Sequence, residues 1–199
     1  MATAAEFQRV TRELFHWQAY EPAVKCDLSA CAVATADGLV FVDPFPLAEP
    51  ALSELATAAK PLAVLVTSGN HQRAADEFRQ RFDVPICATE AAAAELTIKV
   101  DRVIADGEIA PGGMRVIGLP SAGPGEVAYV GNGVAFIGDA LIHLSSHGFA
   151  LLPAKYCADA ARLPNDLRKL LSYDFHILTF AHGAPLTEHA RQRLETLLV

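Results

Sequence analysis

The sequence has few of the features that mark a secreted, membrane-bound or nucleic-acid-binding protein. No apolar run reaches the roughly 18 residues that a membrane span needs, and residues 1–11 lack the basic and apolar regions of a signal peptide. The four cysteines are scattered, with no Cys-x-x-Cys pair, which predicts reduced thiols and a cytoplasmic protein. Only 16 Lys and Arg stand against 23 Asp and Glu, and the net charge of -7 disfavours nucleic acid and anionic membranes as partners.

Several catalytic motifs are also absent. There is no Gly-x-Ser-x-Gly, which excludes a nucleophile elbow. The Gly- and Pro-rich segment Ser121–Gly125 has no lysine, so it does not form a phosphate cradle. Cys31 and Cys87 lie in apolar segments and are predicted to be inert core thiols. The sequence therefore offers no ready-made nucleophile.

What the sequence contains is the composition of a globular protein. Hydrophobic residues make up 52% and charged residues 20% of the 199 residues, enough to bury a sizeable core. No Pro/Gly/Ser-rich linker divides the chain, so we expect a single domain over residues 1–199.

The stretch from Leu62 to Arg73 organises the chain. An apolar, β-branched run ends in the polar turn Thr67–Arg73, and an amphipathic helix with Ala75, Phe78 and Phe82 on one face follows. α/β proteins place their chemistry at the carboxyl ends of such buried strands. The polar residues of this turn are therefore the first candidates for a functional site.

The remaining patterns predict alternating strands and helices along the chain. Thr89 is expected to cap the helix that follows it, Thr187 to cap the last helix, and His16 and Trp17 to be structural. Residues 138–148 are expected to be a loop. The predicted strands cover 14–20, 27–35, 38–42, 62–66, 84–88, 107–109, 114–119, 126–130, 134–137 and 176–180, and the predicted helices cover 47–59, 90–96, 154–171 and 187–198.

Five landmarks, in this order, resemble the metallo-β-lactamase superfamily. Each is weak alone, but together they span nearly the whole chain. They are Val42-Asp43-Pro44, Leu65-Val66-Thr67, the segment 119–126, the segment 136–141, and Phe180-Ala181-His182-Gly183. The resemblance implies an α+β fold, a four-layer αββα sandwich of the metallo-β-lactamase type.

The resemblance fails at most of the metal ligands. The family signature Thr-His-x-His-x-Asp-His is replaced here by Ser68, Asn70, Gln72 and Arg73 at its ligand positions, and Ala122 stands where the next histidine belongs. Only Asp139 and His182 match the family's ligands, as vestigial metal residues. Two ligands do not hold a catalytic ion, because zinc sites use three or four. No cofactor is therefore expected on this interpretation.

The cleft needs another source of positive charge beside Asp139. We expect Arg73 to pair with Asp139 in place of the metal, the alternative being that Arg73 points to solvent. His71 is out of phase with the family's ligand positions. It is either a turn histidine bonded to backbone or part of a rebuilt site with Asp139, His182 and one of His143 and His147.

Three functions remain open on this reasoning. The first is a protein with a degenerate metal centre, not a standard zinc hydrolase, that acts as a small-molecule binding or interaction module. The amides of Ser68–Asn70 beside Arg73 suit a small anionic ligand. The alternative is a metal-dependent hydrolase, with zinc or iron, whose rebuilt site uses His71, Asp139 and His182. The third is an oligomer-forming structural protein with a filled cleft. A homodimer is expected.

Overall fold

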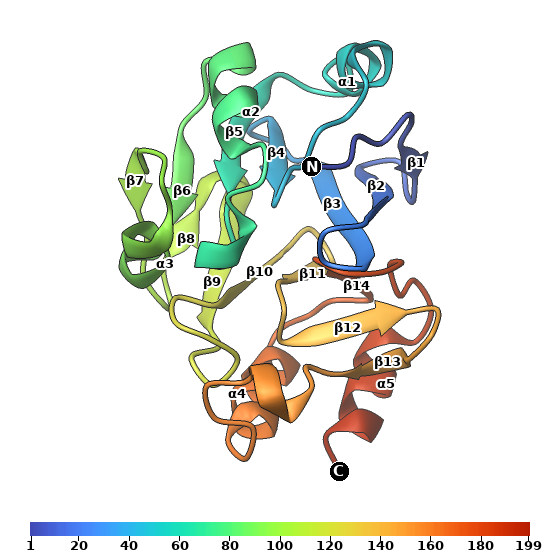
Figure 1. Ribbon diagram of the computed structural model, residues 1–199, viewed down its shortest axis with the longest axis vertical. Coiled ribbons are helices and arrows are strands. Elements are labelled where there is room, and N and C mark those ends of the chain that lie inside the picture. Colours follow the sequence, from blue (N-terminus) through green and yellow to red (C-terminus); the bar gives the residue numbers. More distant parts are fainter.

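The first half of the chain forms a seven-stranded sheet whose spatial order follows the sequence. Strands β1 to β4 pair antiparallel, and β4 to β7 pair parallel through crossover segments. In Figure 1 this sheet and its helices form the blue-to-green half of the molecule. Its strands are β1 (Gln8–Arg9), β2 (Leu14–Glu21), β3 (Cys26–Ala34), β4 (Leu39–Val42), β5 (Pro61–Leu65), β6 (Ile86–Ala88) and β7 (Arg102–Val103), and its helices are α1 (Glu49–Leu55), α2 (Ala75–Phe82) and α3 (Glu90–Glu95).

The second half forms a five-stranded sheet in the order β14-β11-β10-β9-β8. Its one parallel pair joins β11 to β14, so the last strand returns to the edge of the sheet beside β11. The elements of this half are β8 (Ile109–Ala110), β9 (Met114–Gly118), β10 (Val127–Gly131), β11 (Val134–Ile137), a separate hairpin of β12 (Leu141–Leu144) and β13 (Gly148–Leu151), α4 (Leu163–Arg168), β14 (Ile177–Phe180) and α5 (Ala190–Leu197). None of the helices is long and apolar enough to cross a bilayer.

Three layers of buried side chains show how the two sheets are stacked in this computed structural model, which describes all residues from 1 to 199. Along β4, Leu39 and Phe41 join a core under α1 to α3, whereas Val40 and Val42 join a core shared with the second sheet. This alternation is the period-2 pattern of a strand buried on both faces. The third core lies between the second sheet and α4 and α5. The predicted four-layer αββα sandwich is confirmed.

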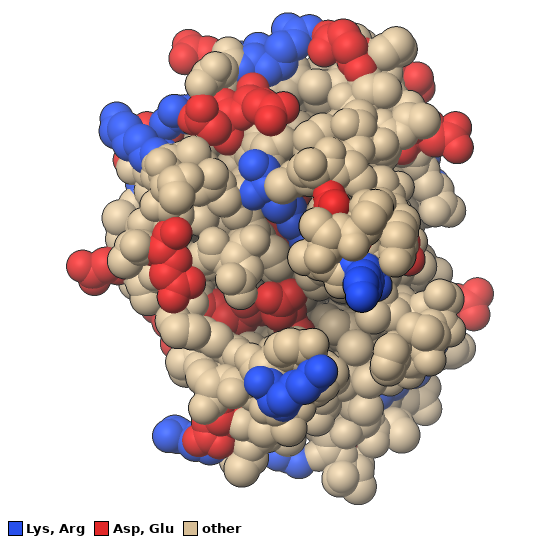
Figure 2. All heavy atoms as spheres, viewed as in Figure 1, with Lys and Arg blue, Asp and Glu red and all other residues tan.

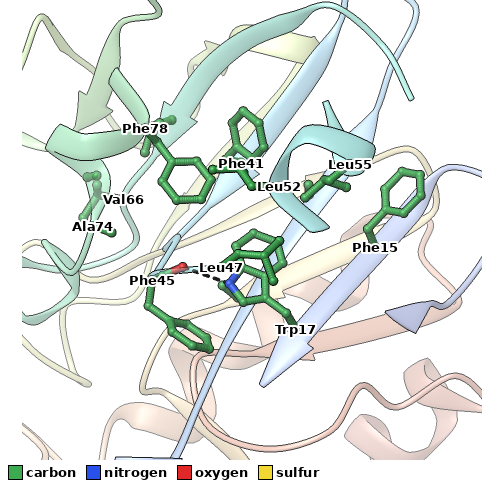
Figure 3. Close-up of a cluster of buried hydrophobic side chains, with 14 of the residues drawn as sticks. Phe15, Trp17, Phe41, Phe45, Leu47, Leu52, Leu55, Val66, Ala74 and Phe78 are labelled. Carbon is green, nitrogen blue, oxygen red and sulfur yellow. Dashed lines mark hydrogen bonds between the residues drawn. The ribbon is translucent and has the colours of Figure 1, made fainter. Parts of the chain in front are cut away.

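Aromatic rings dominate the core under the first helices (Figure 3). Phe78 of α2 stacks on Trp17 of β2 with ring centroids 6.2 Å apart and meets Phe41 edge-to-face at 5.0 Å. The Trp17 indole N–H donates to the carbonyl of Phe45 at 3.0 Å, so its one polar group is satisfied inside the core. This packing fixes the helix that follows the organising turn.

Cys31 and Cys87 are buried between the sheets as predicted. Burial raises the pKa of Cys31 to about 12 and that of Cys87 to about 11, so both remain thiols at neutral pH.

The prediction for the third quarter of the chain is partly wrong. The expected loop 138–148 contains β12 and leads into β13, and the expected helix 154–171 is reduced to two 3₁₀ turns and the six-residue α4. The hairpin has no period-2 hydrophobic pattern because His143 and the residues of β13 are only partly buried. Proline at the start of α4 begins a helix there and does not interrupt one.

The two predicted caps differ in outcome. Thr89 precedes α3 and its hydroxyl accepts the amide N–H of Ala92 at 3.2 Å, as expected. Thr187 does not cap α5, which starts after His189 in a left-handed conformation with no side-chain cap.

Replacing Thr89 with alanine should lower the free energy of unfolding by about 1 kcal/mol, because α3 loses its only side-chain cap. The Thr89 hydroxyl also donates to the carbonyl of Gly125 at 2.9 Å, so the same change loosens the loop before β10. Urea unfolding of Thr89→Ala and of Thr187→Ala tests this, since the second change removes no cap and should cost less.

Candidate metal centre

Four strand ends from both sheets meet at one place in the fold. Asp43 directly follows β4, the turn Thr67–His71 follows β5, Asp139 follows β11, and His182 follows β14. All four strands run in parallel pairs, β4 with β5 and β11 with β14, so the carboxyl ends of each pair lie at the same edge of its sheet. Figure 2 shows acidic side chains recessed in a hollow near the middle of one face of the molecule.

The imidazole of His71 is held from behind by a buried carboxylate. His71 Nδ1 lies 3.0 Å from Asp43 Oδ2 and 2.8 Å from Thr67 Oγ1. Thr67 in turn donates its amide and its hydroxyl to the two oxygens of Asp43, at 2.8 and 2.5 Å. An ionised carboxylate only accepts hydrogen bonds, so His71 Nδ1 carries the proton in this pair.

The imidazole of His182 is anchored in the same way by a different group. Its Nδ1 lies 2.9 Å from the carbonyl oxygen of Asp27 and 3.4 Å from Cys26 Sγ. A carbonyl is also only an acceptor, so Nδ1 of His182 donates as well. In both imidazoles the Nε2 atom is left to face the cleft.

Both Nε2 atoms converge on one carboxylate oxygen. His71 Nε2 and His182 Nε2 each lie 3.3 Å from Asp139 Oδ1, and the three donor atoms lie within 4.8 Å of one another. His71 Nε2 is buried and has no hydrogen-bond partner. With Nδ1 protonated, two neutral imidazoles would aim their lone pairs at an anionic oxygen, which is unfavourable. The arrangement therefore requires a cation, either a proton on an Nε2 or a metal ion.

The pKa values of the cluster also indicate that a positive charge is needed beside Asp139. Burial opposes a charged His71, but the carboxylates of Asp139 and Asp43 outweigh it and raise the pKa of His71 to about 10. Burial likewise opposes ionisation of Asp139, yet His71 and His182 hold its pKa far below the usual range. Burial and the Asp139 charge raise the pKa of Glu126 to about 8, so this neighbouring carboxyl is protonated at neutral pH.

The three converging residues differ in their access to solvent. The side chain of His71 is 3% exposed, whereas those of Asp139 and His182 are 21% and 18% exposed. His71 thus forms the inner wall of the cluster, and the outer side is open.

The predicted ion pair between Arg73 and Asp139 is not formed. The Arg73 guanidinium donates to the carbonyls of Ser29, Asp43 and Ala181 instead, at 2.6, 3.0 and 3.0 Å. The groups that face Asp139 Oδ1 are instead the Nε2 atoms of His71 and His182, each at 3.3 Å. The alternative that Arg73 points to solvent is also wrong, because all three bonds are inside the protein.

His71 is not the backbone-bonded turn histidine of one interpretation, because its partners are carboxylates and a hydroxyl. The other histidines considered for a rebuilt site stay apart from it. His143 Nδ1 contacts the carbonyl of Ala184, and His147 contacts Ser146.

The residues at the family's other ligand positions serve the fold. The Ser68 hydroxyl accepts the amide N–H of Asn70 in the turn. The side-chain oxygen Oε1 of Gln72 accepts the amide and hydroxyl of Thr97, and Ala122 is buried in the core under α4 and α5. None of them joins the donor cluster.

Sequence reasoning missed the residues that orient the histidines. Asp43 appeared only in a landmark, and Thr67 only in a landmark and as one residue of the polar turn, with no role assigned to either. The available signal was an acidic residue directly after the fully apolar β4, since a carboxylate buried there needs a polar partner. Asp27 acts through its main-chain carbonyl, for which no side-chain pattern exists.

Comparison with known proteins agrees with this architecture. Residues 8–196 match the family model described as the metallo-beta-lactamase superfamily. No curated protein matches the sequence. Among solved structures, a metallo-beta-lactamase from Erythrobacter litoralis is 15% identical, with 96% of this chain and 95% of that chain covered and a TM-score of 0.73. One from Pontibacter korlensis is 19% identical, covering 97% and 98%, with a TM-score of 0.72.

A third structure was solved in a di-iron-bound form. This protein, TTHA1623, is 24% identical, with 89% of this chain and 97% of that chain covered and a TM-score of 0.65. At these identities the structures show the shared fold alone, whereas the family model covers almost the whole sequence. The chain belongs to the metallo-beta-lactamase superfamily.

Proposed function

We propose that this protein is a metal-dependent hydrolase that holds one metal ion with His71, Asp139 and His182. One observation carries the proposal: two imidazoles, each anchored through Nδ1, direct Nε2 to the same Asp139 oxygen at 3.3 Å. This is the metal-dependent hydrolase with a rebuilt site that the sequence left open as an alternative. We prefer it to the binding or interaction module with a degenerate metal centre.

The donor set fits a transition-metal ion in type, and the 3.3 Å separations of both Nε2 atoms from Asp139 Oδ1 fit it in spacing. Metal bonds of about 2.0–2.1 Å in a tetrahedral arrangement place neighbouring donors about 3.3 Å apart. Two histidines and one carboxylate are a combination that zinc and non-haem iron accept. The buried Nε2 of His71, which has no hydrogen-bond partner, gains one by binding an ion.

The groups behind the histidines also suit a metal centre. Metal-binding histidines usually donate their other nitrogen to a carboxylate or a carbonyl, which fixes the tautomer. Asp43 plays this part for His71, and the Asp27 carbonyl plays it for His182.

A bound ion would supply Lewis acidity and an acidified water. The chain's own residues prepare the site for a substrate. His71 closes the inner side, and the partly exposed Asp139 and His182 leave the outer side open to solvent. Next to the cluster, the buried Glu126 accepts the amide N–H of Ala140 through Oε1 at 3.1 Å, which fixes the backbone directly after Asp139.

The superfamily relatives guide the choice of metal. One similar structure was determined in a di-iron-bound form, and iron and zinc are therefore the first ions to test. This chain offers three converging donors, which favours one ion over two.

A second candidate function has one specific observation in its favour. The pKa of His71, raised to about 10 by Asp139 and Asp43 against the effect of burial, allows a proton to supply the required cation. The cluster would then be a buried ion pair in a metal-free binding or interaction module. The protonated histidine would take the role that the sequence assigned to Arg73.

Metal analysis distinguishes the two candidates. Protein purified without chelator, and apo-protein titrated with zinc or ferrous iron, should bind about one equivalent. His182→Ala should lose this ion, whereas His147→Ala, a change at an exposed histidine outside the cluster, should keep it. Binding of no zinc, iron or manganese by the wild type rejects the metal centre in favour of the protonated cluster.

A further inference from the structure

Arg73 joins three separate segments of the chain through its guanidinium. One nitrogen, Nη1, donates to the carbonyls of Ser29 in β3 and Asp43 after β4, and Nη2 donates to the carbonyl of Ala181 after β14. Ser29 lies in the first sheet, Asp43 directly follows a strand of that sheet, and Ala181 directly follows a strand of the second sheet. Arg73 is therefore a non-covalent cross-link between the two sheets.

Each segment that Arg73 grips also carries a part of the candidate metal centre. Asp43 holds His71 through its carboxylate, and Ala181 directly precedes His182. Ser29 lies two residues after Asp27, whose carbonyl holds the His182 ring. The Ser29 hydroxyl donates to the Gly183 carbonyl at 2.9 Å and accepts the Gly183 amide at 3.1 Å. The supports of both histidines thus meet at one guanidinium.

We propose that Arg73 is a positioning residue that sets the separation of His71 from His182 and so prepares the two imidazoles for one metal ion. This inference rests on the proposed function, since it concerns the same ion. Arg73 itself is not a ligand, because its hydrogen-bonding nitrogens are directed to main-chain carbonyls.

Arginine is suited to this role for two reasons. Its planar fork can serve three carbonyls in fixed directions, whereas the single ammonium of lysine cannot reproduce that geometry. The Arg73 backbone also adopts a left-handed conformation, with φ of +41°, which costs free energy for a residue with a side chain. The three hydrogen bonds hold the residue in that conformation.

The chain provides a matched control in Arg191 of α5. Its guanidinium donates to the carbonyls of Tyr173 at 2.7 Å and Leu171 at 2.5 Å, neither of which belongs to the candidate centre. Arg191→Lys therefore breaks a similar carbonyl clamp without touching the supports of the histidines.

The test compares zinc affinity in the wild type, Arg73→Lys and Arg191→Lys, by competition with a chromophoric chelator well below the unfolding temperature of each. We expect Arg73→Lys to bind zinc about 10- to 100-fold more weakly, as for other groups that orient ligands. Arg191→Lys should retain wild-type affinity even where its unfolding temperature is lowered. Circular dichroism establishes that each variant is folded.

Three results would reject the positioning role of Arg73, and they can be distinguished from one another. Equal zinc affinity in the wild type and Arg73→Lys rejects the positioning role and leaves the proposed function standing. A wild type that binds no metal rejects both. Should Arg73→Lys fail to fold, Arg73→Gln is the second variant. Failure of both to fold, with Arg191→Lys folded, means that Arg73 is needed for the whole fold and not for spacing the histidines.

Discussion

Replacing Gly183 with alanine should destabilise the protein by about 4 kcal/mol, the combined cost of backbone strain and overpacking. Gly183 has a φ of +103°, which residues with a side chain rarely adopt. A Cβ atom there would lie 2.0 Å from the carbonyl oxygen of His143 and 2.4 Å from its carbonyl carbon. Both are main-chain atoms of β12, so relief requires a shift of the strand.

The same shift should weaken the candidate metal centre. Gly183 directly follows His182, and its amide and carbonyl are both bonded to the Ser29 hydroxyl. The His182 carbonyl also accepts the amide of His143 at 3.2 Å. Displacement of β12 therefore moves the His182 ring away from Asp139. We expect Gly183→Ala to lower zinc affinity as well as stability.

Gly107→Ala is the control that separates the cost of backbone strain from the cost of the steric clash with β12. Gly107 has a φ of +83°, but a Cβ atom there meets nothing within 4 Å. It should pay only the conformational cost, about 1–2 kcal/mol. Urea unfolding measures both variants, and the expected loss for Gly183→Ala corresponds to about 10 °C in unfolding temperature for a protein of this size. If Gly183→Ala and Gly107→Ala lower the free energy of unfolding equally, β12 does not lie close enough to Gly183 to clash with a Cβ atom.

Most of the fold could be predicted from the sequence because the hydrophobic patterns of its strands and helices are local and repeat along each element. Burial sets these patterns. A strand buried on both faces, such as β4 or β5, is apolar throughout, and an amphipathic helix such as α2 is apolar on one face. The order of the landmarks then selected the four-layer arrangement. The hairpin β12–β13 was missed because only Leu141 and Ile142 in it are buried, and two adjacent buried residues do not give the alternating pattern of a strand.

The site was accessible only in part, because its geometry depends on contacts between distant segments. Asp139 and His182 were predicted from their positions in the order of landmarks, and His71 was kept only as an alternative. Its orientation toward Asp139 follows from Asp43 and Thr67, on the preceding strand ends. Arg73 was assigned to the right region but to the wrong partner. Charge complementarity suggested a carboxylate, whereas the closest acceptors are carbonyl groups, which every residue carries.

Acidification below neutral pH should destabilise the protein through His16, by about 3 kcal/mol between pH 6.5 and pH 4. His16 lies in β2 and is 5% exposed, and its Nε2 has no hydrogen-bond partner. Burial lowers the pKa of His16 from 6.5 to about 4, against a hydrogen bond with the Gly183 backbone that favours the charged form. The unfolded chain therefore takes up a proton at a higher pH than the native protein does.

The sign of the effect follows from this order of protonation. Above pH 6.5 both states are neutral at this residue and His16 contributes no pH dependence. Between pH 6.5 and 4 only the unfolded state is protonated, so each step toward acid favours unfolding. Below about pH 4 the native state is protonated too, and the loss levels off. Glu126 acts in the opposite direction, because its pKa of about 8 lets the native state take up that proton before the unfolded chain does. The lowered pKa values of Asp43 and Asp139 add a loss below about pH 4. These contributions are common to the wild type and a His16 variant.

Urea unfolding of the wild type and His16→Gln at several pH values between 7 and 4 isolates the contribution of this histidine. The measurements are made with chelator present, so that a bound ion does not add its own pH dependence. The two stability curves should converge toward acid by about 3 kcal/mol, because the variant lacks the titrating group. His147→Gln, at an exposed histidine, controls for the loss of an imidazole as such. Parallel curves for the wild type and His16→Gln would mean that His16 is charged as readily in the native protein as in the unfolded chain, and that the interior beside Gly183 is open to water.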